Sequence, residues 1–364
     1  VGLTQELKDH ITAVLESTVD ELLRFMYRQL VEQIKTQEIN VITSALRLIE
    51  LLIKDYAAAG AVDPATGTVT TVQLDMFIAF ALLWSVGGAL DEASRPKFSA
   101  FMQQDDAMSA LTVPTAADGM EGDVTFYDFT ILAPTGKKDK ETGVVAYDPA
   151  WILWEDTLSE FIIPLDAKFH QVVVPTKATT LADYFCGKLM RHGVSTLFCG
   201  PTGTGKSVYC KDVMYRQLPP DEFAPLNVNF SAQTTAMQTQ TQVDLKLDKW
   251  RKGKMNIPSL VYGPPGQKKM VLMIDDINMP MIEEYGAQPP IELIRQFMDH
   301  EGWYDHKDKH FRIMKDVTIL AAQMPPGGGR NAITPRLLRH FNVISFIEFD
   351  DSTLRRIFNT FCGW

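Results

Sequence analysis

Apolar residues recur at helical spacing through the first part of the chain. Leu3, Leu7, Ile11 and Val14 stand three or four positions apart, which places them on one face of an amphipathic helix. The same spacing continues as far as Ile34. The pattern therefore predicts one long helix, or two in succession, at the start of the chain.

Two further helices are expected before residue 105. The second pattern covers residues 41–56, and Asn40 stands before it as the predicted N-cap. The apolar run 77–90 predicts a third, buried helix that is too short to span a bilayer. Helices without strands predict an α-helical small subdomain over 1–107, followed by a connector over 108–163.

The pattern changes to alternating strands and helices in the second half of the chain. Short apolar runs without polar alternation indicate strands that are buried on both faces of a sheet. Strand–helix alternation predicts an α/β fold with a five-stranded parallel sheet and helices on both faces, over residues 164–350. Residues 351–364 would begin a following helical segment. The predicted strands are 195–199, 227–230, 270–274, 317–322 and 343–349.

Charge and cysteine usage exclude several classes of function. The net charge of −10 argues against a nucleic-acid partner, and no run is long enough to suggest a membrane partner. The four cysteines form no CxxC pair, which indicates reduced thiols in a cytoplasmic protein. The chain opens at Val1 and ends at Trp364 inside helical patterns, so we expect an excerpt of a longer protein.

One glycine-rich string carries specific chemistry. Residues 200–207 fit the phosphate-loop pattern GxxxxGK[ST] without a mismatch. A predicted strand precedes the string and a predicted helix follows it, so backbone amides and the helix N-terminus can hold phosphates. We expect Lys206 to contact the β- and γ-phosphates of ATP or ADP, and Ser207 to bind Mg²⁺. The binding residues expected in this loop are Gly200, Pro201, Thr202, Gly203, Thr204, Gly205, Lys206 and Ser207.

An acidic pair follows the predicted strand 270–274. Asp275 is expected to hold Mg²⁺ together with Ser207, and Asp276 to orient the attacking water as the catalytic acid. Asp276 is one methylene shorter than the glutamate that is more usual at this position. Slow hydrolysis and nucleotide binding without hydrolysis therefore both stay open.

Two glycine- and proline-rich runs and an arginine pair complete the candidates. The run 262–268 lacks the GK[ST] ending and is predicted to be a loop, whereas 325–330 fits a loop near the γ-phosphate and an ordinary turn equally well. Arg336 and Arg339 stand before the last predicted strand. In ring ATPases an arginine there contacts the nucleotide of the adjacent module, although a surface ion pair explains these two equally well.

Taken together, these strings resemble the AAA+ ring of a dynein heavy chain. More narrowly, the chain resembles the third AAA+ module of an axonemal dynein, preceded by the tail of the second. The resemblance is strong over 160–364 and weaker over 1–160. The further strings that carry it are NFSAQT (229–234), IDDINMP (274–280), YGAQPPIELIRQ (285–296), GWYD (302–305), PPGGGRN (325–331), TPRLLRHFN (334–342), LLWSVGGALDE (82–92) and WILWED (151–156).

The resemblance implies further roles for particular residues. Val174 and Thr176 would lie beside the adenine, and 303–311 would form a hairpin inserted before the fourth core strand. Arg336 and Arg339 would act in trans, on the nucleotide of the second module. The small subdomain at the start of the chain would belong to that second module.

The resemblance also implies a regulatory ATP or ADP site with Mg²⁺ in a P-loop ATPase that drives microtubule-based ciliary movement. Its partners would be adjacent AAA+ modules of the same heavy chain, microtubules through a coiled-coil stalk outside this segment, and other dynein arm subunits. Its location would be the cytoplasm, the cytoskeleton and the axoneme of a cilium or flagellum. Two alternatives stay open: a module of a different AAA+ remodelling ATPase, and a structural site with permanently bound nucleotide.

Overall fold

Two compact units make up the chain. The computed structural model describes residues 3–60, 69–104, 106–115, 118, 124–134, 149–158, 161, 163, 172–251 and 260–363. Contacts group Val1–Leu181 with Phe349–Trp364 in the first unit, and Ala182–Glu348 in the second. The first unit therefore contains described parts of the predicted connector as well as the predicted helical subdomain.

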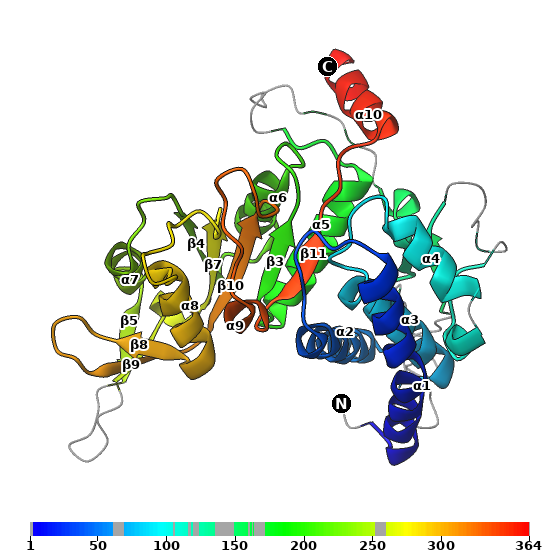
Figure 1. Cartoon of the computed structure of the whole chain (residues 1–364), viewed down its shortest axis with the longest axis horizontal. Coiled ribbons are helices and arrows are strands. Elements are labelled where there is room, and N and C mark those ends of the chain that lie inside the picture. Colours follow the sequence, from blue (N-terminus) through cyan, green and yellow to red (C-terminus); the bar gives the residue numbers. More distant parts are fainter. Residues whose placement is uncertain are drawn as a thin grey trace. The chain divides into compact units, whose positions relative to one another are not determined.

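Helices dominate the first unit. Thr4 caps the first helix by accepting a hydrogen bond from Leu7 N, and the apolar face expected from the sequence is buried at Val14, Leu22 and Met26. Among the described helices, none combines the length and the apolar character needed to cross a membrane. The helices of this unit are α1 (Gln5–Gln29), α2 (Glu38–Ala58), α3 (Thr71–Ser85), α4 (Arg95–Gln104) and α10 (Asp351–Cys362), as labelled in Figure 1.

Helix ends differ from the sequence-based expectations at three places. The first helical pattern was expected to continue as far as Ile34, but α1 ends at Gln29. The prediction of Asn40 as an N-cap is wrong, because α2 already begins at Glu38 and Asn40 is buried in its first turn. The third helix ends at Ser85 and not at residue 90. Its start is specified locally, because Thr70 and Gln73 form a reciprocal capping box.

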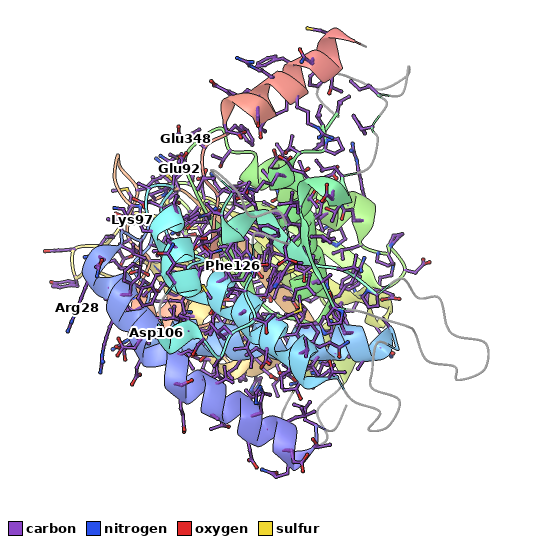
Figure 2. The ribbon with its side chains drawn as sticks, turned by 90° about the vertical axis from the view of Figure 1, so that its right-hand side faces the viewer. Arg28, Glu92, Lys97, Asp106, Phe126 and Glu348 are labelled. Carbon is purple, nitrogen blue, oxygen red and sulfur yellow. The ribbon has the colours of Figure 1, made fainter. Side chains whose placement is uncertain are left out.

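The core of the first unit surrounds α3. This helix is buried on nearly all sides and contacts α1, α2 and the strand β1 (Phe129–Ile131), which pairs antiparallel with β2 (Trp151–Leu153). The short helical turn Phe126–Asp128 precedes β1. Figure 2 shows Phe126 in the interior, whereas the exposed Arg28 and Lys97 lie at the periphery. An apolar surface all around a helix is stable only when neighbours cover every face.

A parallel sheet forms the second unit, as predicted. Its strand order is β11-β3-β10-β7-β4, and every neighbouring pair is parallel; Figure 1 shows the five strands side by side in this order. The strands are β3 (Thr196–Cys199), β4 (Phe223–Asn229), β7 (Lys269–Asp275), β10 (Val317–Gln323) and β11 (Asn342–Ser345).

Helices on the connections cover this sheet. Connections between parallel strands are right-handed. A connection that crosses the sheet in one direction therefore places its helix on one face, and a connection that crosses in the other direction places its helix on the opposite face. The β3–β4 connection carries α6 (Lys206–Asp212) and runs opposite to the later connections. Those later connections carry α7 (Ala236–Asp244), α8 (Pro289–His300) and α9 (Pro335–Leu338), and α8 contacts both α7 and α9.

A second, four-stranded sheet was not anticipated as a unit. Its order is β5-β6-β9-β8, from β5 (Asp248–Arg251), β6 (Leu260–Gly263), β8 (Gly302–Tyr304) and β9 (Phe311–Met314). The antiparallel pair β8–β9 confirms the hairpin that the resemblance implied. The prediction that 262–268 forms a loop is wrong for its first two residues, because Tyr262 and Gly263 end β6.

A buried polar contact closes the core beside α3. Tyr127 Oη donates a hydrogen bond of 2.9 Å to Gly87 O, and its ring meets Trp84 edge-on at 5.4 Å between centroids. The guanidinium of Arg95 lies 4.9 Å from the centre of the Tyr127 ring. Glycine is required at position 87, because a Cβ there would lie 2.6 Å from Leu83 O and would also overlap the Tyr127 hydroxyl.

Gly87→Ala is therefore expected to lower the free energy of unfolding by about 1–3 kcal/mol, through overpacking of this core. Urea unfolding followed by tryptophan fluorescence measures the change. The matched control is Gly187→Ala, where a Cβ meets nothing within 4 Å and where helix propensity predicts a gain of roughly 0.5–1 kcal/mol. A Gly87→Ala protein as stable as its parent would contradict the packing described here.

Candidate nucleotide-binding site

The candidate site lies at one edge of the parallel sheet. β10 runs between β3 and β7, and its register pairs Gln323 with Cys199 and Ala321 with Ile274. Because the strands are parallel, their carboxyl ends meet at the same edge. The phosphate loop after β3 and the acidic pair after β7 are therefore brought together, although they are far apart in the sequence.

Glycines give the phosphate loop its shape. Gly203 and Gly205 adopt φ values of 88° and 77°, a left-handed conformation that glycine enters without a steric penalty. A Cβ at Gly205 would lie 2.5 Å from the Tyr209 ring, and one at Gly200 would lie 2.7 Å from Phe346 O. Two different constraints, backbone conformation and close packing, thus require glycine in this loop.

Lys206 is held inside the loop. Its ammonium donates to Gly200 O at 2.8 Å, to Pro201 O at 2.5 Å and to Thr204 Oγ1 at 3.1 Å. Burial lowers the pKa of Lys206, and the neighbouring thiol of Cys199 and the acidic pair partly oppose that shift. The loop thus keeps a positive charge at the sheet edge, within reach of an anion that can replace its carbonyl partners.

A hydroxyl and a carboxylate meet across the site. Ser207 Oγ, on the first turn of α6, donates a 2.7 Å hydrogen bond to Asp275 Oδ1 at the end of β7. Lys211 Nζ lies 3.6 Å from Asp275 Oδ2. Lys211 was missed by the sequence reasoning, although its spacing of four residues from Ser207 places it on the same face of a helix.

Asp276 leaves the strand in an unusual conformation. Its φ is 52°, in the left-handed region that non-glycine residues seldom adopt, and its side chain is 44% exposed. Its carboxylate Oδ1 lies 3.9 Å from Arg330 Nη2. The turn therefore points the second acid away from the sheet and toward the adjacent loop.

These groups surround one cavity of about 370 Å³. It brings together seven residues that were predicted from the sequence as site residues and four others, of which Arg330 ends the run 325–330 that was expected either near the γ-phosphate or as an ordinary turn. Gly200, Pro201 and Thr204 do not line it and instead hold Lys206. The predicted lining residues are Thr202, Gly203, Gly205, Lys206, Ser207, Asp275 and Asp276, and the additional ones are Val208, Gln323, Met324 and Arg330.

Gln323 ends β10 between the two halves of the site. Its side chain is only 1% exposed, and its amide has no hydrogen-bond partner among the described residues other than the adjacent Cys199 thiol, whose pKa burial raises to about 12. A buried amide with unused hydrogen-bonding capacity beside a polar cavity is suited to binding a ligand oxygen.

Val174 and Thr176 lie in the first unit, whereas the cavity lies in the second. Val174 is buried, and Thr176 caps α5 (Lys177–Arg191) by exchanging hydrogen bonds with Thr179. These contacts give Thr176 a structural role in starting the helix. Its placement beside an adenine, and that of Val174, stays a prediction.

Neither arginine of the predicted trans-acting pair lines the cavity. Arg339 forms an ion pair with Asp299 on α8, and His340 Nε2 lies 2.8 Å from the same carboxylate. Arg336 is exposed on α9, and its guanidinium has no ion pair or hydrogen bond with any residue that the structure describes. The two arginines therefore differ, and only Arg336 presents an uncommitted charge.

Comparison with known proteins decides the family. Residues 161–349 match the family model "P-loop containing dynein motor region", and 11–140 match the "Dynein heavy chain AAA lid domain". Human (Homo sapiens) dynein axonemal heavy chain 1 is 36% identical over 366 residues, which cover 99% of this chain and 8% of that protein. This chain belongs to the dynein heavy chain family. Mouse (Mus musculus) dynein axonemal heavy chain 12 is 39% identical over 282 residues, 77% of this chain and 9% of that protein.

The family assignment confirms the resemblance to dynein and the P-loop AAA+ fold, and it excludes a remodelling ATPase of another class. Human dynein axonemal heavy chain 3 is 33% identical over 377 residues, covering 100% of this chain and 9% of that protein. The chain thus spans less than a tenth of the length of these dynein relatives. The lid match extends to residue 140, beyond the predicted subdomain boundary at 107, which stays a prediction.

Proposed function

We propose that this segment binds ATP or ADP with Mg²⁺ and supplies a regulatory nucleotide site to an axonemal dynein motor. The observation that carries the proposal is the 2.7 Å contact between Ser207 and Asp275 beside the buried Lys206. A hydroxyl and a carboxylate are the oxygen ligands that Mg²⁺ takes in P-loop proteins. In the part of the chain that the structure describes, no three acidic, histidine or cysteine side chains cluster as a metal site, so phosphate oxygens and water would complete the shell.

Each side chain then has a distinct role in binding. Lys206 exchanges its loop carbonyls for oxygens of the β- and γ-phosphates, while the loop amides and the N-terminus of α6 hold the β-phosphate. Ser207 and Asp275 hold the cation, and bound Mg²⁺ supplies positive charge at the phosphate oxygens. Gln323 is placed to donate a hydrogen bond from the end of β10.

Asp276 is the residue that we assign to hydrolysis. It lines the cavity directly after the metal-binding Asp275, where a carboxylate can accept a proton from an attacking water. Its side chain is short and its carboxylate is partly exposed. Both features favour slow turnover, which suits a site that regulates a motor by its nucleotide state.

The family also supports a proposal for the larger assembly. We infer that the chain contributes the third AAA+ module and the lid of the second, within a ring of modules from the same heavy chain. Microtubules would be contacted through a coiled-coil stalk outside this segment, and other dynein arm subunits would bind elsewhere. The word "axonemal" in the relatives' names supports a location in the axoneme of a cilium or flagellum.

Arg336 is the better candidate for an arginine that acts on the neighbouring module. Its guanidinium is exposed and forms no ion pair or hydrogen bond within the described part of the chain, whereas Arg339 is already paired with Asp299. Arg336 follows β10 on α9 and does not line this chain's own cavity. A planar guanidinium binds phosphate oxygens through two parallel hydrogen bonds, which an ammonium cannot do.

Lys206→Ala is expected to weaken nucleotide binding at this site on the order of a hundredfold, because several charge-assisted hydrogen bonds are lost together. Photolabelling of the full-length protein with an azido-ATP, followed by mapping of the labelled peptide, resolves this site from others. Lys246→Ala, which removes an exposed lysine outside the cavity, should label like the parent. Undiminished labelling of Lys206→Ala would remove the phosphate-loop assignment.

Asp276→Asn is expected to leave labelling within about threefold of the parent and to slow conversion of the bound triphosphate by roughly a hundredfold or more. The ratio of diphosphate to triphosphate on the labelled peptide measures this. Asp276→Glu, which restores the usual reach, should convert faster than the parent. A site with permanently bound nucleotide would show neither exchange nor conversion in any variant. If Asp275→Asn were harmless while Asp276→Asn abolished Mg²⁺-dependent labelling, the two roles would be reversed.

Arg336→Ala is expected to change nucleotide handling at the preceding module, with labelling of the Lys206 site unchanged. Loss of a trans-acting arginine lowers hydrolysis on the order of a thousandfold where the affected site hydrolyses. Comparison of every labelled peptide in the full-length protein, with Arg339→Ala beside it, measures the effect. An effect confined to this chain's own site, or none at any site, argues for a surface arginine that contributes under about 1 kcal/mol.

A further inference from the structure

A glycine turn follows β10 at the edge of the cavity. Gly327, Gly328 and Gly329 have φ values of 128°, 57° and 86°. Gly327 N donates to Arg330 O and Arg330 N donates to Gly327 O, both at 3.1 Å. No atom lies within 4 Å of a Cβ built at these glycines, so the requirement for glycine is conformational. The turn sets the position of the Arg330 backbone.

Hydrogen bonds join this turn to the segment that follows the acidic pair. Asn331 N donates to Asn278 O at 3.1 Å, and Asn331 Nδ2 donates to Pro280 O at 2.8 Å. In return, Asn278 Nδ2 donates to Met324 O at 2.9 Å. Residues 324–331 and 276–280 are therefore tied together, and a displacement of one segment is transmitted to the other.

Arg330 has hydrogen-bonding capacity that the protein does not use. Its side chain is 25% exposed and lines the same cavity as Lys206 and Ser207. Its Nη2 lies 3.9 Å from Asp276 Oδ1, which is beyond hydrogen-bond distance. Its Nε is buried and has no hydrogen-bond partner among the described residues. A guanidinium withdrawn from water normally satisfies its donors, so this one is suited to an anion that enters the cavity.

We propose that Arg330 binds the γ-phosphate of ATP in this chain's own site and makes the site distinguish ATP from ADP. The inference rests on the proposed nucleotide-binding function. Lys206 and Ser207 mark the β-phosphate end of the cavity, and Asp276 marks the end where water would attack. Arg330 lies beside Asp276, at the end that a third phosphate reaches and a second does not.

The ion pair between Arg330 and Asp276 also couples the bound nucleotide to the carboxylate of Asp276. With ATP bound, Arg330 exchanges the distant carboxylate of Asp276 for phosphate oxygens, which carry more charge and offer more acceptors. Asp276 then loses its ion pair with Arg330 and is free to orient water. With ADP bound, Arg330 stays beside Asp276. Because the glycine turn is tied to residues 276–280, the exchange links the presence of the γ-phosphate to the position of that segment.

Competition photolabelling of the full-length protein tests the proposal. Azido-ADP labels the peptide of this site, and either ADP or a non-hydrolysable ATP analogue competes with it. Arg330→Ala should raise the concentration of the ATP analogue needed for half-competition on the order of tenfold and leave that of ADP unchanged. Arg330→Lys should fall between Arg330→Ala and the parent, because an ammonium keeps the charge but not the planar pair of donors.

Two control variants distinguish failure of the proposed role of Arg330 from failure of the proposed nucleotide site. Arg28→Ala removes an exposed arginine on α1 that does not line the cavity (Figure 2), and it should compete like the parent. Equal weakening of both nucleotides by Arg330→Ala, or no change in either, overturns the role of Arg330. If Lys206→Ala also left labelling intact, the proposed nucleotide site itself would fail, which is a different result.

Discussion

Parallel pairing of β3, β10 and β7 is the constraint on which the candidate site depends. The phosphate loop and Asp275 belong to strands that do not touch each other, because β10 lies between them. Only when all three strands align in parallel do their carboxyl ends share an edge. The Ser207–Asp275 hydrogen bond then spans that edge and connects α6 to the end of β7. The site is thus a product of the whole sheet and cannot form from the loop alone.

The same edge concentrates polar groups that the protein leaves incompletely satisfied. Gln323 keeps a largely unpartnered amide, and Arg330 has a buried Nε without an acceptor among the residues that the structure describes. Each of these arrangements costs stability relative to a fully paired interior. Their convergence on one cavity is the pattern expected where a polar ligand supplies the missing partners.

In the first unit, α3 is apolar on every face from Met76 to Trp84. It is covered by α1, α2 and β1, and the connector contributes Phe126 and Tyr127 to the same core. The match of residues 11–140 to the dynein lid family is consistent with this packing, since it includes part of the connector as well as the helices. A helix of this composition has no stable exposed surface, so the surrounding elements are obligatory.

Local patterns in the sequence determined much of this protein. The phosphate loop, the five core strands and the acidic pair each depend on neighbouring residues, and strand–helix alternation restricts the fold to a parallel sheet. The N-cap prediction at Asn40 failed because a capping residue marks the start of a helix only if the helix does not extend past it, and α2 already begins at Glu38.

Tertiary structure decided which distant residues share the site. Arg330 enters the cavity and Arg339 does not, although the two lie nine positions apart on the same connection. A glycine turn tied to Asn278 directs the first, and Asp299 on α8 holds the second. Neither partner is identified by spacing along the chain. Contacts between segments far apart in the sequence leave no local pattern, and so only the folded arrangement of strands and turns determines them.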